Sequence, residues 1–318
     1  MNGEFPMPVA IAFFFVIAGL IMLVGGGEVL VSGATRLAKR LGMSTLVIGL
    51  TVVAFGTSVP ELFVSLSASF HGHPDIMIGN IVGSNIANIG LILGISAMLQ
   101  RLEMKLQEVW TELLLVVSGS VILIICSSLG FFPRPIGFIF IITLISYTYF
   151  AFRNHCNNNH VQETVKVPET TVARFLPVLL IAAGLILLNF GSEIFIKGAA
   201  DIARHYGISE LVIGLTLAAI GTSLPELASS MSALRRNESG LLIGNVIGSN
   251  MFNLFMVMGL TGIIFPFSLS KDLLHRDLPV MIAFSLALVA ILGHTKGTNK
   301  WHGVLFFGSY CAYCFSLL

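Results

Sequence analysis

Charged residues are scarce in this chain. Of its 318 residues only 10% are Asp, Glu, Lys or Arg, whereas 55% are hydrophobic and the mean hydropathy is +0.92. Water-soluble globular domains carry about 25% charged residues, so the composition excludes that class and indicates a polytopic membrane protein. The 17 basic residues form no run that could follow a phosphate backbone, which argues against nucleic-acid binding.

The sequence also has few cysteines and no recognisable signal peptide. The four cysteines follow no metal-binding spacing except for one CxxC in an apolar C-terminal segment, a pattern that favours packing over redox or metal chemistry. The N-terminus has no basic region before its first apolar stretch, so no cleaved signal peptide is expected. The sequence gives no sign of a bound cofactor or of a protein partner.

What the chain has in abundance is apolar runs of about 20 residues, the length needed to cross a bilayer. They predict ten membrane helices near 8–34, 44–70, 78–99, 112–130, 134–152, 174–199, 209–234, 241–266, 276–293 and 301–318. The only long polar stretch, 153–173, separates them into two sets of five. We therefore predict an all-α membrane protein with a first five-helix repeat at 1–152, a polar linker, and a second repeat at 174–318.

The two sets share an internal repeat. The segment from Gly26 to Gly94 recurs without a gap, 165 residues later, as Gly191 to Gly259, and roughly thirty of the 69 paired positions are identical. The basic residues predict its orientation, because twelve Lys and Arg lie in the loops after odd-numbered spans and five on the other side. These loops are then cytoplasmic and both termini outside, in a prokaryotic plasma membrane. Five spans being an odd number, the second repeat is inverted.

Acidic and hydroxyl side chains recur inside the second and seventh spans. In the motif GTSVPE, Pro60 cannot donate a hydrogen bond to the Gly56 carbonyl, so the helix should break there and leave carbonyl oxygens free. At helical spacing Glu61 shares a face with Thr57, Ser58 and Ser65. The second copy has Thr222, Ser223 and Glu226 in the same places, with Ser229 one helical turn further on. Oxygen ligands of this kind are those that Ca²⁺ and Na⁺ require.

A polar stripe runs along the third and eighth spans. Its residues are spaced four apart and are Asn80, Ser84 and Asn88 in the first copy and Asn245, Ser249 and Asn253 in the second. Nearby glycines should let this helix pack closely against the broken one, so that the stripe faces the glutamates. Taken singly, Asn80, Asn85, Asn245 and Asn250 are more typical of helix-to-helix hydrogen bonds than of ion ligands.

These motifs resemble the paired alpha-repeats of the sodium/calcium exchanger family, in its short prokaryotic form. The resemblance covers nearly the whole chain. It implies that the glutamates coordinate Ca²⁺ and contribute to Na⁺ sites, together with Thr57, Ser58, Thr222, Ser223, Ser84, Asn88, Ser249 and Asn253, and with carbonyls at Ala54 and Ala218. Some microbial members have Asp where this chain has Asn253, so one charge is absent here.

The residues and the resemblance together predict secondary active antiport of Ca²⁺ against Na⁺ by alternating access. The ions bind transiently and the lipid bilayer is the surrounding partner. A Ca²⁺/H⁺ exchanger would use the same glutamates, and a passive cation channel would need no counter-ion. An intramembrane hydrolase is disfavoured, because no embedded histidine or aspartate pair accompanies a nucleophile. The roles of Glu28 and Glu193 stay open between an ion path and structural pairing, with Lys197 as a partner for Glu193.

Overall fold

The structure is a computed structural model that describes residues 8–157, 171–208, 221–269 and 273–317. Eight helices among them are long and apolar enough to cross a membrane, rather than the ten predicted. The seventh predicted span lies partly outside the described residues, and the tenth corresponds to the 17-residue helix α15. The eight are Val9–Leu41, Thr45–Phe70, Pro74–Leu99, Leu106–Leu129, Arg134–Arg153, Phe175–His205, Ser239–Ile264 and His275–His294.

Three of these spans are interrupted. The second comprises α2 (Thr45–Ile48), the π-helical segment η1 (Gly49–Val53), α3 (Ala54–Thr57) and α4 (Val59–Phe70). The third comprises α5 (Pro74–Ala87), η2 (Asn88–Leu93) and α6 (Gly94–Leu99), and its counterpart comprises α12 (Ser239–Phe252), η3 (Asn253–Met258) and α13 (Gly259–Ile264). The remaining helix of the seventh predicted span is α11 (Leu224–Arg235).

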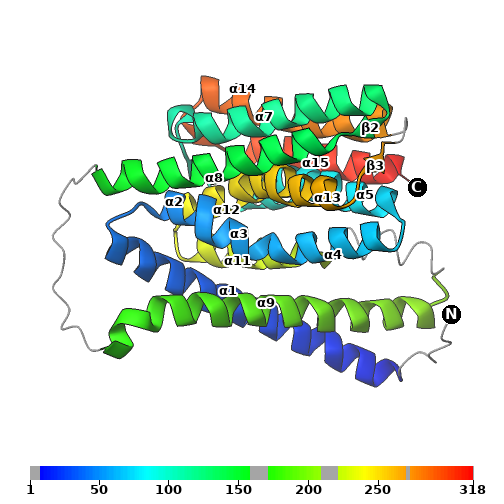
Figure 1. The fold of residues 1–318 in the computed structure, drawn as a ribbon. Helices are drawn as coiled ribbons and strands as arrows, with labels where there is room; N and C mark the ends of the chain where they lie inside the picture. Colours follow the sequence, from blue (N-terminus) through cyan, green and yellow to red (C-terminus); the bar gives the residue numbers. More distant parts are fainter. Residues whose placement is uncertain (1–7, 158–170, 209–220, 270–272, 318) are drawn as a thin grey trace.

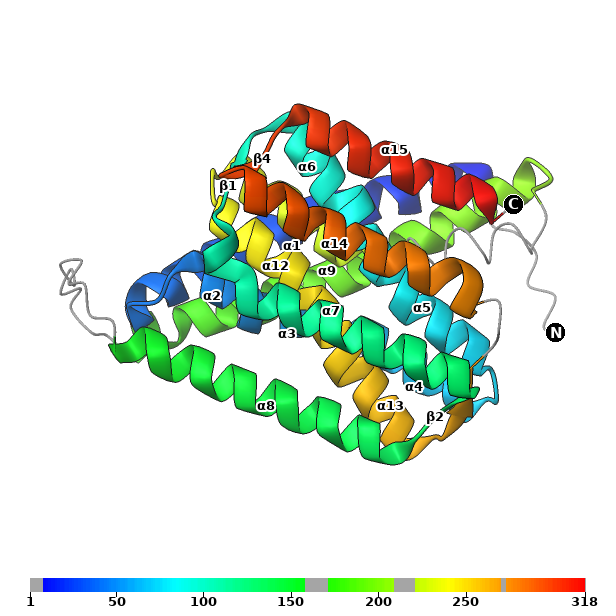
Figure 2. The same ribbon diagram turned by 90° about the horizontal axis from the view of Figure 1, so that it is seen from above.

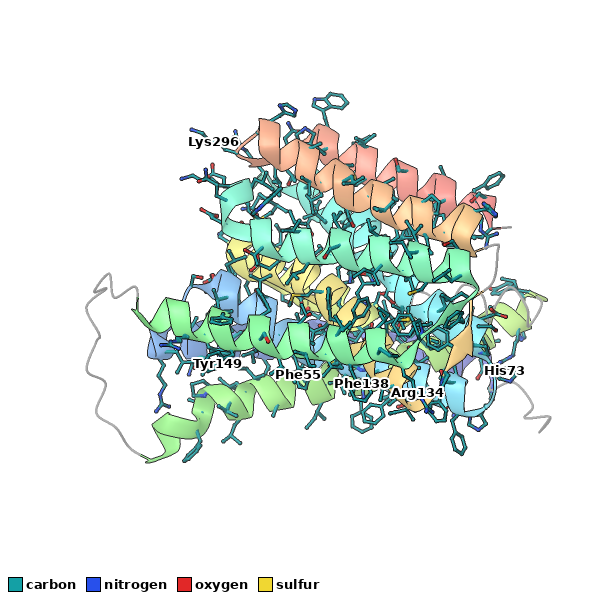
Figure 3. The ribbon with its side chains drawn as sticks, turned by 45° about the horizontal axis from the view of Figure 1, so that its top comes forward. Phe55, His73, Arg134, Phe138, Tyr149 and Lys296 are labelled. Carbon is teal, nitrogen blue, oxygen red and sulfur yellow. The ribbon has the colours of Figure 1, made fainter. Side chains whose placement is uncertain are left out.

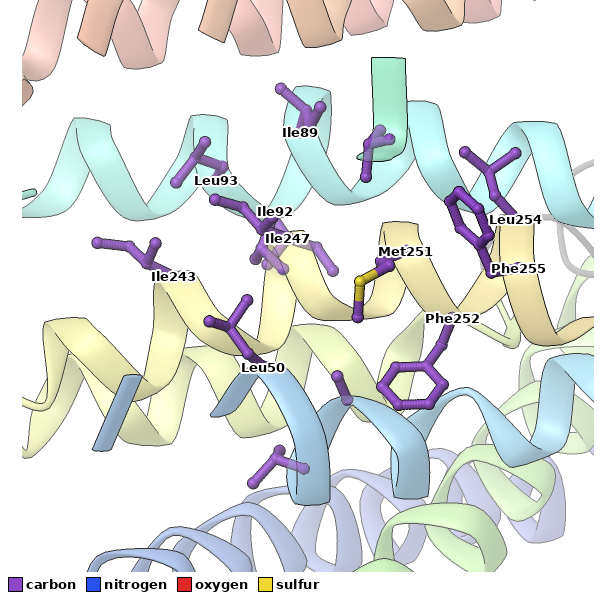
Figure 4. Close-up of a cluster of buried hydrophobic side chains, with 14 of the residues drawn as sticks. Leu50, Ile89, Ile92, Leu93, Ile243, Ile247, Met251, Phe252, Leu254 and Phe255 are labelled. Atoms are coloured by element: carbon purple, nitrogen blue, oxygen red, sulfur yellow. The ribbon is translucent and has the colours of Figure 1, made fainter. Parts of the chain in front are cut away.

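The interrupted spans form the centre of the molecule. The most apolar stretch of Ser239–Ile264 is 100% buried, whereas that of α1 (Val9–Leu41) is 22% buried. Figure 4 shows Leu50, Ile92 and Ile247 gathered where η1, η2 and α12 meet, and each of them is at most 2% exposed. The burial of this whole span makes α12 and η3 the centre of the bundle, against which the other helices pack.

A separate helix pair lies along one side of this core (Figure 1). α1 and α9 (Thr171–His205) run antiparallel, because early residues of α1 contact late residues of α9 and the reverse. Glycines let the backbones touch: a Cβ atom at Gly19 would lie 2.8 Å from the Gly191 carbonyl oxygen, and one at Gly198 would lie 2.6 Å from that of Ala12. Small residues at such crossings allow close packing of membrane helices.

The outer helices of one half cover the inner helices of the other. α8 (Arg134–Asn157) packs on α13, and α15 (Lys300–Ser316) packs on α6, as Figure 2 shows. Beside them lie α7 (Leu106–Leu129) and α14 (Leu278–His294), the latter preceded by η4 (Leu273–Asp277). Two antiparallel ladders join the halves at the ends: β1 (Leu102–Glu103) with β4 (Gly297–Thr298), and β2 (Phe131–Phe132) with β3 (Phe267–Ser268).

The outer surface carries large apolar side chains. On α8, Phe138 is 53% exposed and Tyr149 59% exposed, and both point away from the helix bundle in Figure 3. Many further phenylalanines, leucines and isoleucines are exposed on α1, α9 and α15. Water-soluble monomers rarely expose so much contiguous apolar surface, so these faces contact lipid. The chain is an integral membrane protein.

Candidate functional site

The break predicted in the second span lies at Ser58. α3 ends at Thr57, Ser58 has φ −82° and ψ −1°, and α4 begins at Val59. Pro60 occupies the first turn of α4 and lacks the N–H that would bond to the preceding turn. Ser223 repeats this geometry, with φ −88° and ψ 0°, immediately before α11. The structure thus confirms the helix break in the first copy. In the second copy it shows the same geometry at the start of α11, while residues 209–220 before it lie outside the described residues.

The glutamate after each break is enclosed by protein. Glu61 is 0% and Glu226 1% exposed, and each stands in the first turn of its helix. Free N–H groups at a helix N-terminus favour a negative charge. The two carboxyl groups lie near enough to interact electrostatically, although 165 residues separate them in the chain. The fold therefore brings the two predicted carboxylates together.

Buried polar atoms without partners belong mostly to the predicted ligands, the two glutamates among them. In the described part of the chain, fifteen buried side-chain oxygen and nitrogen atoms have no hydrogen-bond partner, and ten of them belong to predicted ligands. These residues are Glu61, Glu226, Ser58, Ser84, Asn88, Ser223 and Asn253. Buried polar groups in folded proteins nearly always have a hydrogen-bond partner. The concentration of exceptions indicates a site shaped for a ligand.

One asparagine in each copy holds the broken helix in place. The Asn80 amide nitrogen donates to the Glu61 carbonyl oxygen at 3.3 Å and to Ser65 Oγ at 3.0 Å. Asn245 makes the equivalent two contacts in the second copy, to the Glu226 carbonyl oxygen at 3.4 Å and to Ser230 Oγ at 3.2 Å, and it also donates to Ser229 Oγ at 3.0 Å. The interpretation of these asparagines as helix-to-helix hydrogen bonders is confirmed. They fix the backbone that carries each glutamate.

The threonines at the breaks reach across to the other copy. The Thr57 hydroxyl donates to Asn245 Oδ1 at 3.2 Å, and the Thr222 hydroxyl donates to Asn80 Oδ1 at 3.1 Å. Thr57 Oγ1 also lies 3.3 Å from Ser249 Oγ. The amide nitrogen of each asparagine thus binds the helix that carries the glutamate of the same copy. Its amide oxygen binds the threonine at the helix break of the other copy. Moving one break would therefore disturb the other.

The helices of the polar stripe change pitch at predicted ligands. η2 begins at Asn88 and η3 at Asn253. Such π-helical turns occur frequently at functional sites. The Asn88 side chain donates to Asn250 Oδ1 at 2.9 Å, while the counterpart atoms, Asn253 Nδ2 and Asn85 Oδ1, have no hydrogen-bond partner among the described residues. The side-chain hydrogen bond between the two copies is therefore formed by Asn88 and Asn250 but not by their counterparts, Asn253 and Asn85.

The predicted carbonyl ligands lie before the breaks. The Ala54 carbonyl accepts a hydrogen bond from the Ser58 N–H at 3.0 Å, and it lies 3.4 Å from Thr57 Oγ1, whose single hydrogen it shares with Asn245 Oδ1. Ala218, the other predicted carbonyl ligand, lies outside the described residues. The first copy therefore brings its carbonyl to the break, where it is shared with two protein donors.

Glu28 and Glu193 lie apart from the buried cluster. Glu28 Oε2 is 2.8 Å from Arg236 Nε, an ion pair that joins α1 to the end of α11. For Glu28 the structure thus shows pairing. Glu193 is exposed, and within the described residues Lys197 forms no ion pair with it. The expected partner of Glu193 is therefore not found.

Comparison with known proteins connects this geometry to a family. The sequence profile described as Sodium/calcium exchanger protein matches residues 11–153 and 176–318. The sodium/calcium exchanger MaX1 of Methanosarcina acetivorans is 31% identical, over 96% of this chain and 98% of its own. A solved structure of the sodium-calcium exchanger NCX_Mj superposes with a TM-score of 0.85 at 32% identity, covering 98% of this chain and 100% of that one. The Ca(2+)/H(+) antiporter ChaA of Bacillus subtilis is more distant, 24% identical over 80% of this chain and 77% of its own.

Proposed function

Because the chain belongs to the sodium/calcium exchanger family, we propose that it carries Ca²⁺ across its membrane in exchange for Na⁺. The likeness to MaX1, to NCX_Mj and to ChaA supports Ca²⁺ antiport as the class of transport. Na⁺ as the counter-ion is the more specific part of the proposal. It follows from the many hydroxyl and amide oxygens beside the two carboxylates, a set that suits a weakly charged cation.

The observation that carries the proposal is the pair of enclosed carboxylates without a hydrogen-bond partner in the described residues. A charge at bilayer depth costs at least ~2.5 to 3.5 kcal/mol unless something compensates it. A bound cation compensates it, and Ca²⁺ takes six to eight oxygen ligands in proteins. Two carboxylates with hydroxyl, amide and carbonyl oxygens around them supply ligands of that kind.

We assign Ca²⁺ chiefly to Glu61 and Glu226 and Na⁺ to overlapping oxygens of the same site. The remaining proposed ligands are Thr57, Ser58, Ser84, Asn88, Thr222, Ser223, Ser249 and Asn253, with the carbonyls of Ala54 and Ala218. Because both ions use the glutamates, they compete. The carrier can change its open side only when one complement of ions or the other neutralises the carboxylates.

The architecture we propose is ten spans in two inverted repeats. Its support lies in contacts that recur between the halves: α8 on α13 corresponds to α15 on α6, and β1 with β4 corresponds to β2 with β3. The bonds of Asn80 to the Glu61 carbonyl and to Ser65 recur as those of Asn245 to the Glu226 carbonyl and to Ser230. Inverted repeats place their shared site near the membrane midplane, where the two glutamates would stand.

Alternating access would move the α1 and α9 pair along the central helices. The pair lies outside the core and is joined to it by few polar contacts, among them the ion pair of Glu28 with Arg236. The loops rich in Lys and Arg would face the cytoplasm, with both termini outside and the protein in a prokaryotic plasma membrane.

The proposal is tested by ⁴⁵Ca²⁺ uptake into proteoliposomes that contain the purified protein. Vesicles loaded with Na⁺ should accumulate Ca²⁺ when diluted into Na⁺-free medium, and vesicles loaded with choline at the same pH should not. Uptake that follows an imposed pH gradient and ignores Na⁺ would instead identify a Ca²⁺/H⁺ exchanger. Uptake that needs neither gradient would identify a passive channel.

The stripe serines should separate the two ions. Ser84→Ala and Ser249→Ala each remove one neutral oxygen, so we expect several-fold weaker apparent Na⁺ affinity and Ca²⁺ affinity within about threefold of the native value, because Ca²⁺ is held mainly by the carboxylates. The two variants differ in stability. Ser84 Oγ has no partner in the described residues, whereas Ser249 Oγ lies 3.3 Å from Thr57, so only Ser249→Ala should lower the melting temperature.

Ser96→Ala is the matched control for this pair. Ser96 is fully buried in the same span as Ser84, but its hydroxyl donates to the Ile92 carbonyl of its own helix at 2.7 Å. Na⁺ dependence of exchange should be unchanged in this variant. If the Na⁺ dependence of exchange is the same in all three variants, Ser84 and Ser249 are not ligands of the site.

A further inference from the structure

A hydroxyl that the motifs do not contain reaches the broken helix of the second copy. Ser192 lies on α9, is 5% exposed, and donates a hydrogen bond to the Gly221 carbonyl oxygen at 2.7 Å. Gly221 stands four residues before Pro225. Its carbonyl is therefore the one that Pro225 cannot bond in the helix. The carbonyl that the proline leaves without a donor in its own helix is instead held by α9.

The first copy has no equivalent donor at this position. The residue 165 places before Ser192 is Gly27, which carries no side chain. A Cβ atom at Gly27 would lie 2.5 Å from Ser232 Oγ and 2.8 Å from the Ala228 carbonyl oxygen, so α1 approaches α11 too closely for a serine there. The two copies therefore differ in the residue that can donate to the carbonyl at the break, although the motif around each break is repeated.

The hydrogen bond has a consequence for cation binding. A hydroxyl directs its positive end at the oxygen that it donates to, and this reduces the attraction of that oxygen for a cation. A buried carbonyl that loses its donor has its full negative potential available, and the loss of a partner costs free energy until a ligand replaces it. The position of α9 thus determines how good a ligand Gly221 can be.

We propose that Ser192 is a positioning residue that couples the position of α9 to the affinity of the cation site. In the arrangement seen here it holds the Gly221 carbonyl and weakens cation binding. When α9 moves along the core, the hydroxyl leaves and the carbonyl becomes a full ligand. This inference rests on the proposed cation exchange, which it deepens by naming a group outside the repeated motifs that regulates the same site.

The test is equilibrium ⁴⁵Ca²⁺ binding to the purified full-length protein in detergent, with Na⁺ as competitor. Ser192→Ala removes the donor with little change in volume, and we expect about tenfold tighter Ca²⁺ binding, equivalent to about 1.4 kcal/mol. Ser192→Thr keeps a hydroxyl and should bind like the native protein. Ser120→Ala is the control, because Ser120 is also buried but donates to the Val116 carbonyl of its own helix.

The outcomes separate this inference from the proposed function. Tighter binding in Ser192→Ala alone, with native melting temperatures in Ser192→Thr, supports the coupling. Unchanged Ca²⁺ affinity in Ser192→Ala, in a protein that still exchanges Na⁺ for Ca²⁺ in vesicles, overturns the coupling and leaves the exchange function standing. A native protein that binds neither cation overturns both.

Discussion

Glu61→Gln and Glu226→Gln should each abolish Ca²⁺ exchange. Each replacement removes one negative charge from a site enclosed in protein, where both glutamates are at most 1% exposed. A unit charge about 4 Å away is worth about 4 kcal/mol at an effective dielectric constant of 20, and a divalent ion loses more than that. A loss of at least about a thousand-fold in Ca²⁺ affinity follows. Na⁺-driven ⁴⁵Ca²⁺ uptake in proteoliposomes measures it.

The same replacements should leave the protein inserted and more stable when no cation is supplied. The two carboxyl groups are enclosed by protein and close enough to repel each other, so glutamine removes one of two like charges when no cation lies between them. We expect the melting temperature in Na⁺-free, Ca²⁺-free buffer to rise by a few degrees in each variant. Near-native uptake in either variant would exclude that residue from the site.

Glu112→Gln is the matched control for the two site variants. Glu112 is also a buried glutamate in a membrane helix, 8% exposed, but its Oε1 accepts a hydrogen bond from the Tyr147 hydroxyl at 2.6 Å. Glutamine keeps an oxygen that can accept this bond. Exchange should therefore persist in Glu112→Gln, and the cation-free melting temperature should not rise.

The local features of the site follow from sequence because they depend on residues close together in the chain. Pro60 cannot continue the hydrogen-bond ladder of a helix, so a break near Ser58 was predictable and is found. Side chains four residues apart share a helix face, which predicts the stripe that carries Asn80 and Ser84. The repeat itself predicts that whatever holds for one copy holds, to first order, for the other.

The contacts between copies could not be read in this way. Thr57 bonds to Asn245 across 188 positions, and nothing in the spacing of either motif specifies that partner. The π-helical turns at Asn88 and Asn253 are equally hidden, because their sequences fit an ordinary helix. Differences between the copies are the hardest to anticipate. Ser192 against Gly27 becomes informative only once the Gly221 carbonyl is seen beside it.

Membrane spans show a related limit. Hydropathy identifies apolar segments but not where a helix continues into the polar region, so α1 extends to Leu41 and α9 to His205, beyond the predicted ends at 34 and 199. The last turns of both helices carry basic residues that dilute the signal without ending the helix. Helix ends are set by capping, as by Gly42 with φ 65° after α1.

Close packing of glycine backbones links the fold to the site. Gly244, beside Asn245 on α12, faces the backbone of the second span. A Cβ atom there would lie 2.8 Å from the Leu50 nitrogen and 3.0 Å from the Gly49 carbonyl carbon. Backbone atoms cannot rotate away as a flexible side chain can, so even one methyl group must push the two spans apart. Asn245 would then lose its hold on the second glutamate's helix and on Thr57.

Gly244→Ala should accordingly reduce both stability and exchange. Overpacking of this kind costs about 1–3 kcal/mol. If the whole cost destabilises the assembled cation site, the affinity of that site falls by roughly five- to over a hundred-fold. The control is Gly308→Ala, at an exposed position of α15 where a Cβ atom meets no described atom within 4 Å. Melting temperature and Na⁺-driven ⁴⁵Ca²⁺ uptake should fall in Gly244→Ala and stay native in Gly308→Ala. If Gly244→Ala melts and transports like the native protein, the two spans do not touch as closely as this site requires, and Asn245 does not govern the geometry of the glutamates.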